Sequence, residues 1–331
     1  MKVTVLGAGS WGSTLAILLE NNGHEVTLWE YKKDYAKYLI KHRENKIFLP
    51  GITIPKSILI THDLLEATEN RHLIVIAIPT QFIRSVLKKI SKLNYSNTTI
   101  VSVAKGIEKD SHAIVHQIIM EEIPTIDLQN IGVLSGPSHA EEVSRKIPTV
   151  VVAASESQAT AELIQATFMT SYFRVYSSND VIGVELGGAL KNVIAIGAGI
   201  IDGAKFGDNT KAAIMTRGIA EISRLGIAMG AQPQTFSGLS GMGDLIVTCM
   251  SKHSRNRYVG EQIGAGAKLK DVLKKMDMVA EGVETSKSVY LLAEKYNVEV
   301  PISKAVYQIL FEEKDPIKIT YDLMTREMKP E

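Results

Sequence analysis

A lysine lies inside a mostly apolar segment, residues 185–194, whose sequence is ELGGALKNVI. A lysine that is kept from water gives up its proton more easily, as a general base requires, so Lys191 is a candidate catalytic residue. The alternative is a side chain whose stem lies in the core while its ammonium reaches the surface. Each glycine at 187 and 188 costs a helix about 1 kcal/mol against alanine. We therefore expect the backbone there to approach a neighbour or a ligand closely.

A second polar cluster, SRNR at residues 254–257, follows a glycine-dense segment that ends at Asp244. A guanidinium with hydroxyl and amide neighbours can clamp a phosphate, particularly if Ser254 caps a helix that runs toward Gly264. A solvated basic helix start would have the same composition. Asp244 could be a turn residue or could orient a catalytic lysine.

Two further polar segments, VAKG at 103–106 and SGPSHA at 135–140, each follow a predicted strand. Open α/β sheets hold their ligands at the carboxyl ends of the strands, which places Lys105 well, although a lysine there is more often a loop residue. The second segment offers a backbone N–H, a hydroxyl and a helix start, or else a turn capped by Ser138. No orienting carboxylate accompanies His139, which favours a structural histidine.

The motif GAGSWG at residues 7–12 has the pattern GxGxxG, directly after a predicted strand and before a helical run from Ser13 to Leu19. The first glycine permits a tight turn, the second lets backbone amides reach a pyrophosphate, and the third allows close packing of helix on strand. The motif therefore predicts dinucleotide binding. At the end of the next strand, Glu30 would bind the ribose of NAD, whereas Lys32 would favour the 2′-phosphate of NADP. The residues leave that choice open.

Helices and strands must hold these segments in place, and the pattern of apolar residues along the chain changes near Asn179. Before that point, nearly continuous apolar runs alternate with helical stretches, which predicts a doubly wound, mostly parallel sheet of Rossmann type. After it, helical spacing dominates. We expect a dinucleotide-binding domain at 1–180 and a helical substrate domain at 181–331. The expected strands are 3–6, 25–29, 73–78, 99–103, 131–134, 149–153 and 173–176, and the expected helices of the second domain are 185–203, 211–225, 269–275, 284–295 and 304–311.

Composition excludes several classes of function. The 331 residues carry 37 Lys and Arg against 36 Asp and Glu, so no overall field would attract nucleic acid or an anionic membrane. The single cysteine, Cys249, cannot form an intrachain disulfide, and we expect it to be a buried apolar residue. No run approaches the roughly 18 uninterrupted apolar residues of a membrane span. We expect a cytoplasmic protein that uses no metal, and a homodimer stays open.

Taken in order along almost the whole chain, these motifs resemble the bacterial NAD(P)-dependent glycerol-3-phosphate dehydrogenase family. The segments that carry the resemblance are GAGSWG at 7–12, LPG at 49–51, VAKGIE at 103–108, SGPSHA at 135–140, ELGGALKNVIAI at 185–196, GDLIVTC at 243–249, SRNR at 254–257 and EGVET at 281–285. Members often carry Arg or His where this chain has Tyr31, a departure that bears on the choice of coenzyme and leaves the chemistry unchanged.

The resemblance implies a role for each matching residue. Lys191 would be the proton acceptor, with Lys105 and Asp244 beside it in catalysis. The implied substrate-binding residues are Lys105, Gly136, Ser138, Lys191, Asp244, Ser254, Arg255 and Asn256. The implied cofactor-binding residues are Gly7, Gly9, Ser10, Trp11, Gly12, Tyr31, Lys32, Phe48, Lys105, Ala140, Arg255, Val279 and Glu281.

The expected reaction is hydride transfer between glycerol 3-phosphate and dihydroxyacetone phosphate with NAD or NADP, which would supply glycerol 3-phosphate for phospholipid synthesis. Two other classes of function stay open. A β-hydroxyacid dehydrogenase also pairs a Rossmann domain with a helical domain, but the SRNR cluster favours a phosphate over a lone carboxylate. A non-catalytic NAD(H) sensor would have no need of both Lys105 and Lys191.

Overall fold

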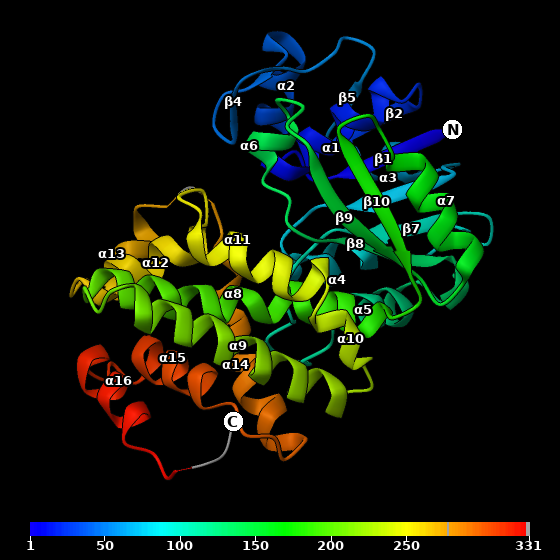
Figure 1. The fold of residues 1–331 in the computed structure, drawn as a ribbon. Helices are drawn as coiled ribbons and strands as arrows, with labels where there is room; N and C mark the ends of the chain where they lie inside the picture. The colour runs from blue at the N-terminus through cyan, green and yellow to red at the C-terminus, as the bar shows by residue number, and fades with distance from the viewer. Residues whose placement is uncertain (277, 329–331) are drawn as a thin grey trace. The chain divides into compact units, whose positions relative to one another are not determined.

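The computed structural model describes residues 1–276 and 278–328, which form two compact units (Figure 1). The first unit comprises Met1–Lys105 and Ala113–Glu185, and the second comprises Gly106–His112 and Leu186–Glu331. The units thus divide inside a helix, several residues after the turn at Asn179, and a short segment from the first half of the chain belongs to the second unit. The single division at residue 180 stays a prediction.

The first unit is built on an eight-stranded sheet with the order β10-β9-β8-β7-β6-β1-β2-β5. All neighbouring strands run parallel except β8 and β9, which confirms the expected mostly parallel sheet. The three-residue strand β5 is too short to show a period in the sequence. The strands are β1 (Lys2–Leu6), β2 (Glu25–Trp29), β5 (Leu59–Thr61), β6 (Leu73–Ile76), β7 (Thr99–Ser102), β8 (Ile131–Ser135), β9 (Thr149–Ala154) and β10 (Phe173–Ser178).

Helices cover both faces of this sheet, as its continuous apolar strands require. Val3 and Val5 of β1 pack with residues of α1 and α7 in one core cluster. Leu6, on the opposite face of β1, packs with residues of α4 and α5 in another. The doubly wound prediction is therefore confirmed. The remaining elements of this unit are α1 (Ser10–Asn21), α2 (Lys33–His42), α3 (Leu64–Thr68), α4 (Thr80–Ile90), α5 (Val115–Glu122), the 3-10 helix η1 (Leu128–Asn130), α6 (Ala140–Val143), α7 (Gln158–Phe168) and a hairpin of β3 (Glu44–Asn45) and β4 (Leu49–Thr53).

Helices are the regular elements of the second unit in its described residues, as the helical spacing of apolar residues after Asn179 predicts. Its core helix α8 (Val181–Gly203) starts in the first unit and continues into the second. A π-helical turn, η2 (Leu239–Gly243), leads into α11. The other helices are α9 (Asp208–Ala228), α10 (Pro233–Phe236), α11 (Asp244–Met250), α12 (Arg255–Gly264), α13 (Leu269–Lys274), α14 (Glu281–Lys295), α15 (Pro301–Phe311) and α16 (Pro316–Met324).

Glycines let α8 and α12 touch backbone to backbone. A Cβ built on Gly199 or Gly203 of α8 would collide with the carbonyl oxygen of Arg257 or Glu261 in α12. Conversely, a Cβ on Gly260 or Gly264 would collide with carbonyl oxygens of α8. Each helix thus presents two glycines four residues apart, on one face, to the other. This pairing fixes the spacing between the helix that carries Lys191 and the helix that begins at Arg255.

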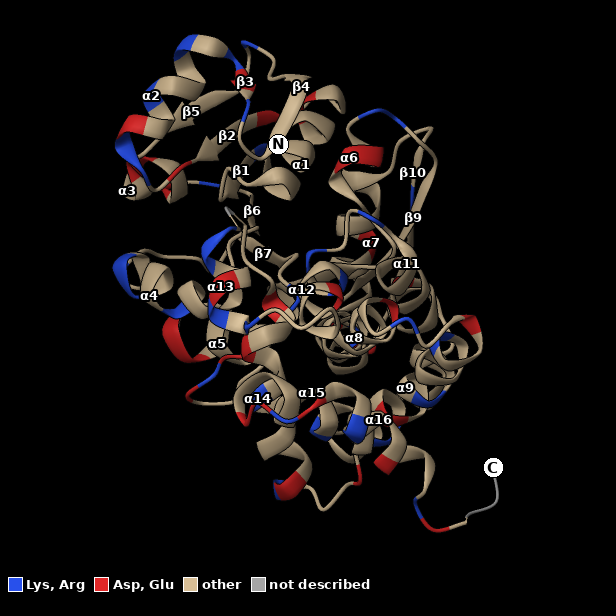
Figure 2. Cartoon of the chain, turned by 90° about the vertical axis from the view of Figure 1, so that its left-hand side faces the viewer, with Lys and Arg blue, Asp and Glu red and all other residues tan. Residues whose placement is uncertain are grey.

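Among the described helices, α8 is the one that is long and apolar enough to cross a membrane, and its most apolar window is entirely buried within the protein. A core helix of a globular domain has these same properties. Figure 2 shows that Lys and Arg occur together with Asp and Glu in each unit, as the balanced composition predicts.

Candidate active site

The glycine-rich loop joins β1 to α1, and its three glycines differ in their surroundings. Gly7 has a φ of +110°, and a Cβ there would lie 2.7 Å from the carbonyl oxygen of Ala77. A Cβ on Gly12 would collide with the carbonyl oxygen of Gly7. By contrast, a Cβ on Gly9 would meet nothing within 4 Å. Gly7 and Gly12 therefore serve the turn and the packing, while Gly9 leaves room in front of the N-terminus of α1, where a pyrophosphate would fit.

The end of β2 carries a buried carboxylate. Glu30 is 5% exposed, and its Oε1 accepts a hydrogen bond of 2.9 Å from the backbone N–H of Lys32. Burial raises the pKa of Glu30 above its usual value, against the opposing hydrogen bond and charge of Lys32. Tyr31 is exposed, with the ammonium of Lys32 over its ring at 5.4 Å. Phe48 is half-buried and contacts Tyr35 edge-on, with 5.8 Å between ring centroids.

Lys105, Gly136 and Ser138 come together at the carboxyl end of the sheet. The Lys105 Nζ and the Ser138 hydroxyl each donate a hydrogen bond of 2.9 Å to the Gly136 carbonyl oxygen. Helix α6 begins at Ala140 with His139 at its N-cap, so the alternative that Ser138 is the N-cap is wrong: its hydroxyl turns back to Gly136 instead. Ala140 itself is buried.

In the second unit, Lys191 is 5% exposed and forms an ion pair with Asp244. It also donates a hydrogen bond of 2.8 Å to the hydroxyl of Thr248. The alternative that Lys191 reaches the surface is therefore wrong. Thr248 was missed by the sequence analysis, although it lies four residues after Asp244 and so on the same face of α11. The ion pair agrees with the alternative in which Asp244 orients this lysine.

Gly187 and Cys249 are both tightly packed in the structure. A Cβ on Gly187 would lie 2.5 Å from the Ser240 carbonyl oxygen, which confirms that a close backbone approach explains this glycine. Cys249 is fully buried, and burial raises the pKa of its thiol to about 12, so a thiolate does not form near neutral pH.

The SRNR cluster opens α12, as expected. The Ser254 hydroxyl caps the helix by accepting a hydrogen bond of 3.2 Å from the backbone N–H of Arg257. Arg257 is held by Asp202 of α8, with its Nε 2.7 Å from the carboxylate, and therefore has a structural role. The Arg255 side chain is exposed.

Three helices converge next to Lys191. The buried Asn256 accepts a hydrogen bond of 2.9 Å from the backbone N–H of Gly282, the second residue of α14. A Cβ on Gly282 would lie 2.6 Å from the carbonyl oxygen of Asn192, the residue after Lys191. Glu281, the first residue of α14, is half-buried there, and Val279 before it is exposed. The second unit therefore gathers Asn256 and the start of α14 against the Lys191 segment of α8.

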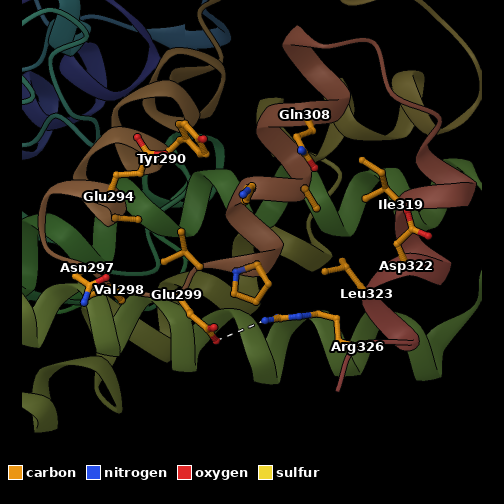
Figure 3. Close-up of a pocket in the computed structure, with 15 residues that line it drawn as sticks. Tyr290, Glu294, Asn297, Val298, Glu299, Gln308, Ile319, Asp322, Leu323 and Arg326 are labelled. Carbon is orange, nitrogen blue, oxygen red and sulfur yellow. Dashed lines mark hydrogen bonds and ion pairs between the residues drawn. The ribbon is translucent and has the colours of Figure 1, made fainter. Parts of the chain in front are cut away.

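An open hollow of the second unit lies elsewhere, with a volume of about 510 Å³. Residues of α14, α15 and α16 border it, as Figure 3 shows, with Tyr290 and Arg326 among the residues that line it. None of the predicted site residues lines it. In the described residues, no group of three or more His, Cys, Asp or Glu side chains is arranged to hold a metal ion.

A Rossmann-type sheet with a pyrophosphate-binding loop, joined to a helical unit with a buried lysine, defines the class of nicotinamide-dependent dehydrogenases. Two family profiles match the chain, described as the N-terminus and the C-terminus of NAD-dependent glycerol-3-phosphate dehydrogenase, over residues 2–161 and 180–321. The chain belongs to this family.

Named relatives are similar over the full length. The chain is 53% identical to glycerol-3-phosphate dehydrogenase [NAD(P)+] of Chlorobium phaeobacteroides and 52% identical to that of Prosthecochloris aestuarii, in each case over all of this chain and at least 99% of the relative. A crystal structure of glycerol-3-phosphate dehydrogenase from Coxiella burnetii matches with a TM-score of 0.94 at 35% identity, covering 98% of this chain and 99% of that one.

Proposed function

We propose that this chain interconverts dihydroxyacetone phosphate and sn-glycerol 3-phosphate, with Lys191 as the residue that transfers the proton. The observation that carries this proposal is the buried ammonium of Lys191, which is held by Asp244 and Thr248 next to the point where α12 and α14 meet α8. A buried cation in this setting can donate a proton to a ketone oxygen and take it back from the alcohol.

The glycine loop, Ser10 and Trp11 would hold NAD or NADP, and the bound nicotinamide supplies or accepts the hydride. In reduction, the Lys191 ammonium polarises the C2 carbonyl and gives its proton to the oxygen as the hydride reaches C2. Asp244 would hold the ammonium in place. In oxidation, the neutral amine of Lys191 takes the hydroxyl proton as the hydride leaves.

Phosphate binding falls to the start of α12. Its N-terminus offers backbone N–H groups and a favourable dipole, and the exposed guanidinium of Arg255 adds a bidentate donor. In the first unit, Lys105, Gly136 and Ser138 are proposed substrate-binding residues, and Ala140 is a proposed cofactor-binding residue. In the second unit, Val279 and Glu281 are proposed cofactor-binding residues. Cytoplasmic location, a homodimeric state and a supply role in phospholipid synthesis belong to the same proposal.

Replacement of Lys191 tests the assignment. We expect Lys191→Ala to bind NADH with unchanged affinity and to lose at least roughly a hundredfold in kcat, because the proton-transfer group is gone. Lys211→Ala is the matched control, since Lys211 also pairs with an aspartate, Asp202, at 2.8 Å in the same unit. Its kcat should stay within about twofold of the wild-type value. A near wild-type kcat in Lys191→Ala would exclude the assignment.

Replacement of Arg255 tests the phosphate clamp. We expect Arg255→Ala to raise KM for dihydroxyacetone phosphate by about tenfold or more, because a charge-assisted contact to the phosphate is lost. Lys252→Ala removes an exposed cation three residues earlier and should leave KM unchanged.

Reduction of dihydroxyacetone, glyceraldehyde 3-phosphate and a β-ketoacid, each followed by NADH absorbance, defines the substrate class. A preference for the unphosphorylated ketone or the ketoacid would overturn the proposed function.

A further inference from the structure

A buried asparagine below the glycine loop uses its whole hydrogen-bonding capacity. Asn45 is fully buried, and its Nδ2 donates to the carbonyl oxygen of Ala8 at 2.7 Å and to the hydroxyl of Ser13 at 2.8 Å. Its Oδ1 accepts from the Tyr35 hydroxyl at 2.6 Å and from the backbone N–H of Phe48 at 3.2 Å. Two donors and two acceptor sites are all that a carboxamide has, so Asn45 is saturated.

The contact with Ala8 fixes a peptide plane in the loop itself. Ala8 stands between the first two glycines, and its carbonyl is bonded to Gly9 in a planar trans peptide. The carbonyl and the N–H of such a peptide point in opposite directions, so the Asn45 amide, by holding the Ala8 oxygen, aims the Gly9 N–H away from itself. Gly9 is also the residue in front of which a Cβ would meet nothing within 4 Å. The Gly9 amide is thus oriented before any ligand arrives.

The same side chain ties the loop to two other elements. Ser13 lies in the first turn of α1, Tyr35 lies in α2, and Phe48 belongs to the connection between β3 and β4. Tyr35 in turn contacts the Phe48 ring edge-on. A dinucleotide on the loop would extend its adenosine half toward the end of β2, where α2 begins. One buried amide therefore sets the pyrophosphate loop and the Phe48 connection relative to each other.

We propose that Asn45 is a positioning residue for the dinucleotide, acting through the Ala8–Gly9 peptide on the pyrophosphate and through Tyr35 and Phe48 on the adenosine half. The inference rests on the proposed function for the identity of the ligand as NAD(P)H. It assigns Asn45 no contact with either substrate and no part in proton transfer.

The test compares two asparagines that each donate two hydrogen bonds from Nδ2 in the same unit. Asn22, at the other end of α1, donates to the carbonyl oxygens of Thr167 and Met169 at 2.9 and 3.1 Å. We expect Asn45→Ala to weaken NADH binding, measured by fluorescence titration, by about tenfold or more. Asn22→Ala should lower the melting temperature with Kd within about twofold of the wild-type value. With NADH saturating, KM for dihydroxyacetone phosphate should be unchanged in both variants.

A milder pair of variants guards against loss of folding. Asn45→Ser keeps a small polar group, and Tyr35→Phe removes a single hydroxyl from the network; both should weaken NADH binding by less than Asn45→Ala does. Wild-type Kd for NADH in folded Asn45→Ala or Asn45→Ser, with only the melting temperature lowered, would overturn the proposal. NADH binding by the wild-type protein without reduction of any phosphorylated ketone would instead overturn the proposed function and leave the role of Asn45 standing.

Discussion

At the scale of single residues, the carboxylate of Glu30 is the group on which coenzyme choice turns. Its Oε1 is held by the backbone N–H of Lys32, at the end of β2 where a ribose 2′-hydroxyl would lie. A fixed carboxylate accepts a hydrogen bond from that hydroxyl and repels a 2′-phosphate. The neighbouring Lys32 is exposed and lies over Tyr31. Because the buried carboxylate is fixed and Lys32 is exposed, we expect a preference for NAD.

Removal of the Glu30 charge should shift this choice. We expect the wild-type protein to bind NADH more tightly than NADPH, and Glu30→Gln to improve NADPH relative to NADH by about tenfold, because the repulsion is lost while the shape is kept. Fluorescence titration with both coenzymes measures the ratio. Lys32→Ala is the control: a large loss of NADPH binding in that variant, with no effect of Glu30→Gln, would make Lys32 the determinant.

At the scale of elements, a buried ion pair joins α5 to the start of α8. The backbone N–H of His116 donates to Glu185 at 2.9 Å, and its Nδ1 lies 2.7 Å from the other carboxylate oxygen. Burial lowers the pKa of His116, but the hydrogen bond and charge of Glu185, with the charge of Glu156, outweigh it and raise the pKa above 6.5. The folded protein thus binds this proton more tightly than the unfolded chain does.

The pair should make stability depend on pH. A raised pKa in the folded state gives stabilisation that is complete below about pH 6.5 and is lost as pH rises through the folded-state value. We expect the free energy of unfolding of the wild type to exceed that of His116→Gln most at about pH 5.5, and this excess to shrink as the pH is raised to about 8.5. Urea denaturation at several pH values measures it. A constant difference would show that His116 stays neutral.

The sequence predicted many secondary-structure elements but not the contacts between distant residues. Long apolar runs such as Leu73–Ile76 and the glycine fingerprint carry a local signal, so the sheet, the loop and the helical second half were predictable. The contacts of Lys191 with Asp244 and Thr248, and of Asn45 with Ala8, join residues that are tens of positions apart. No period or spacing encodes such a contact in a single sequence. The β3–β4 hairpin was not among the expected strands, and Pro50 and Gly51 lie inside β4.

At the scale of the whole molecule, coenzyme binding should appear as global stability. A ligand that binds only the folded protein stabilises it by about 2.7 kcal/mol at a hundred times its Kd. Within the glycine loop, Gly9 has an extended backbone and open space in front of it, whereas Gly12 packs against the Gly7 carbonyl. A substitution at Gly9 should therefore affect coenzyme binding, whereas a substitution at Gly12 should affect the stability of the fold.

Alanine at these two positions should change different quantities: the NADH-induced shift in melting temperature at Gly9, and the melting temperature without NADH at Gly12. We expect Gly9→Ala to keep the melting temperature of the unliganded protein and to lose most of the increase that NADH causes, because the methyl group occupies the space for the pyrophosphate. Gly12→Ala should lower the melting temperature without NADH, because its methyl group collides with backbone. Thermal unfolding with and without NADH measures both. An undiminished NADH shift in Gly9→Ala would place the dinucleotide elsewhere.

The glycine contact between α8 and α12 has a consequence for attempts to redesign substrate choice. Because main chain already meets main chain at Gly199, Gly203, Gly260 and Gly264, these helices cannot draw closer, and any added carbon forces them apart. A library of variants made to accept larger or smaller phosphate esters would gain nothing from substitutions at these four positions. Variation belongs instead at Arg255, the exposed first residue of α12, which is not one of these contact glycines.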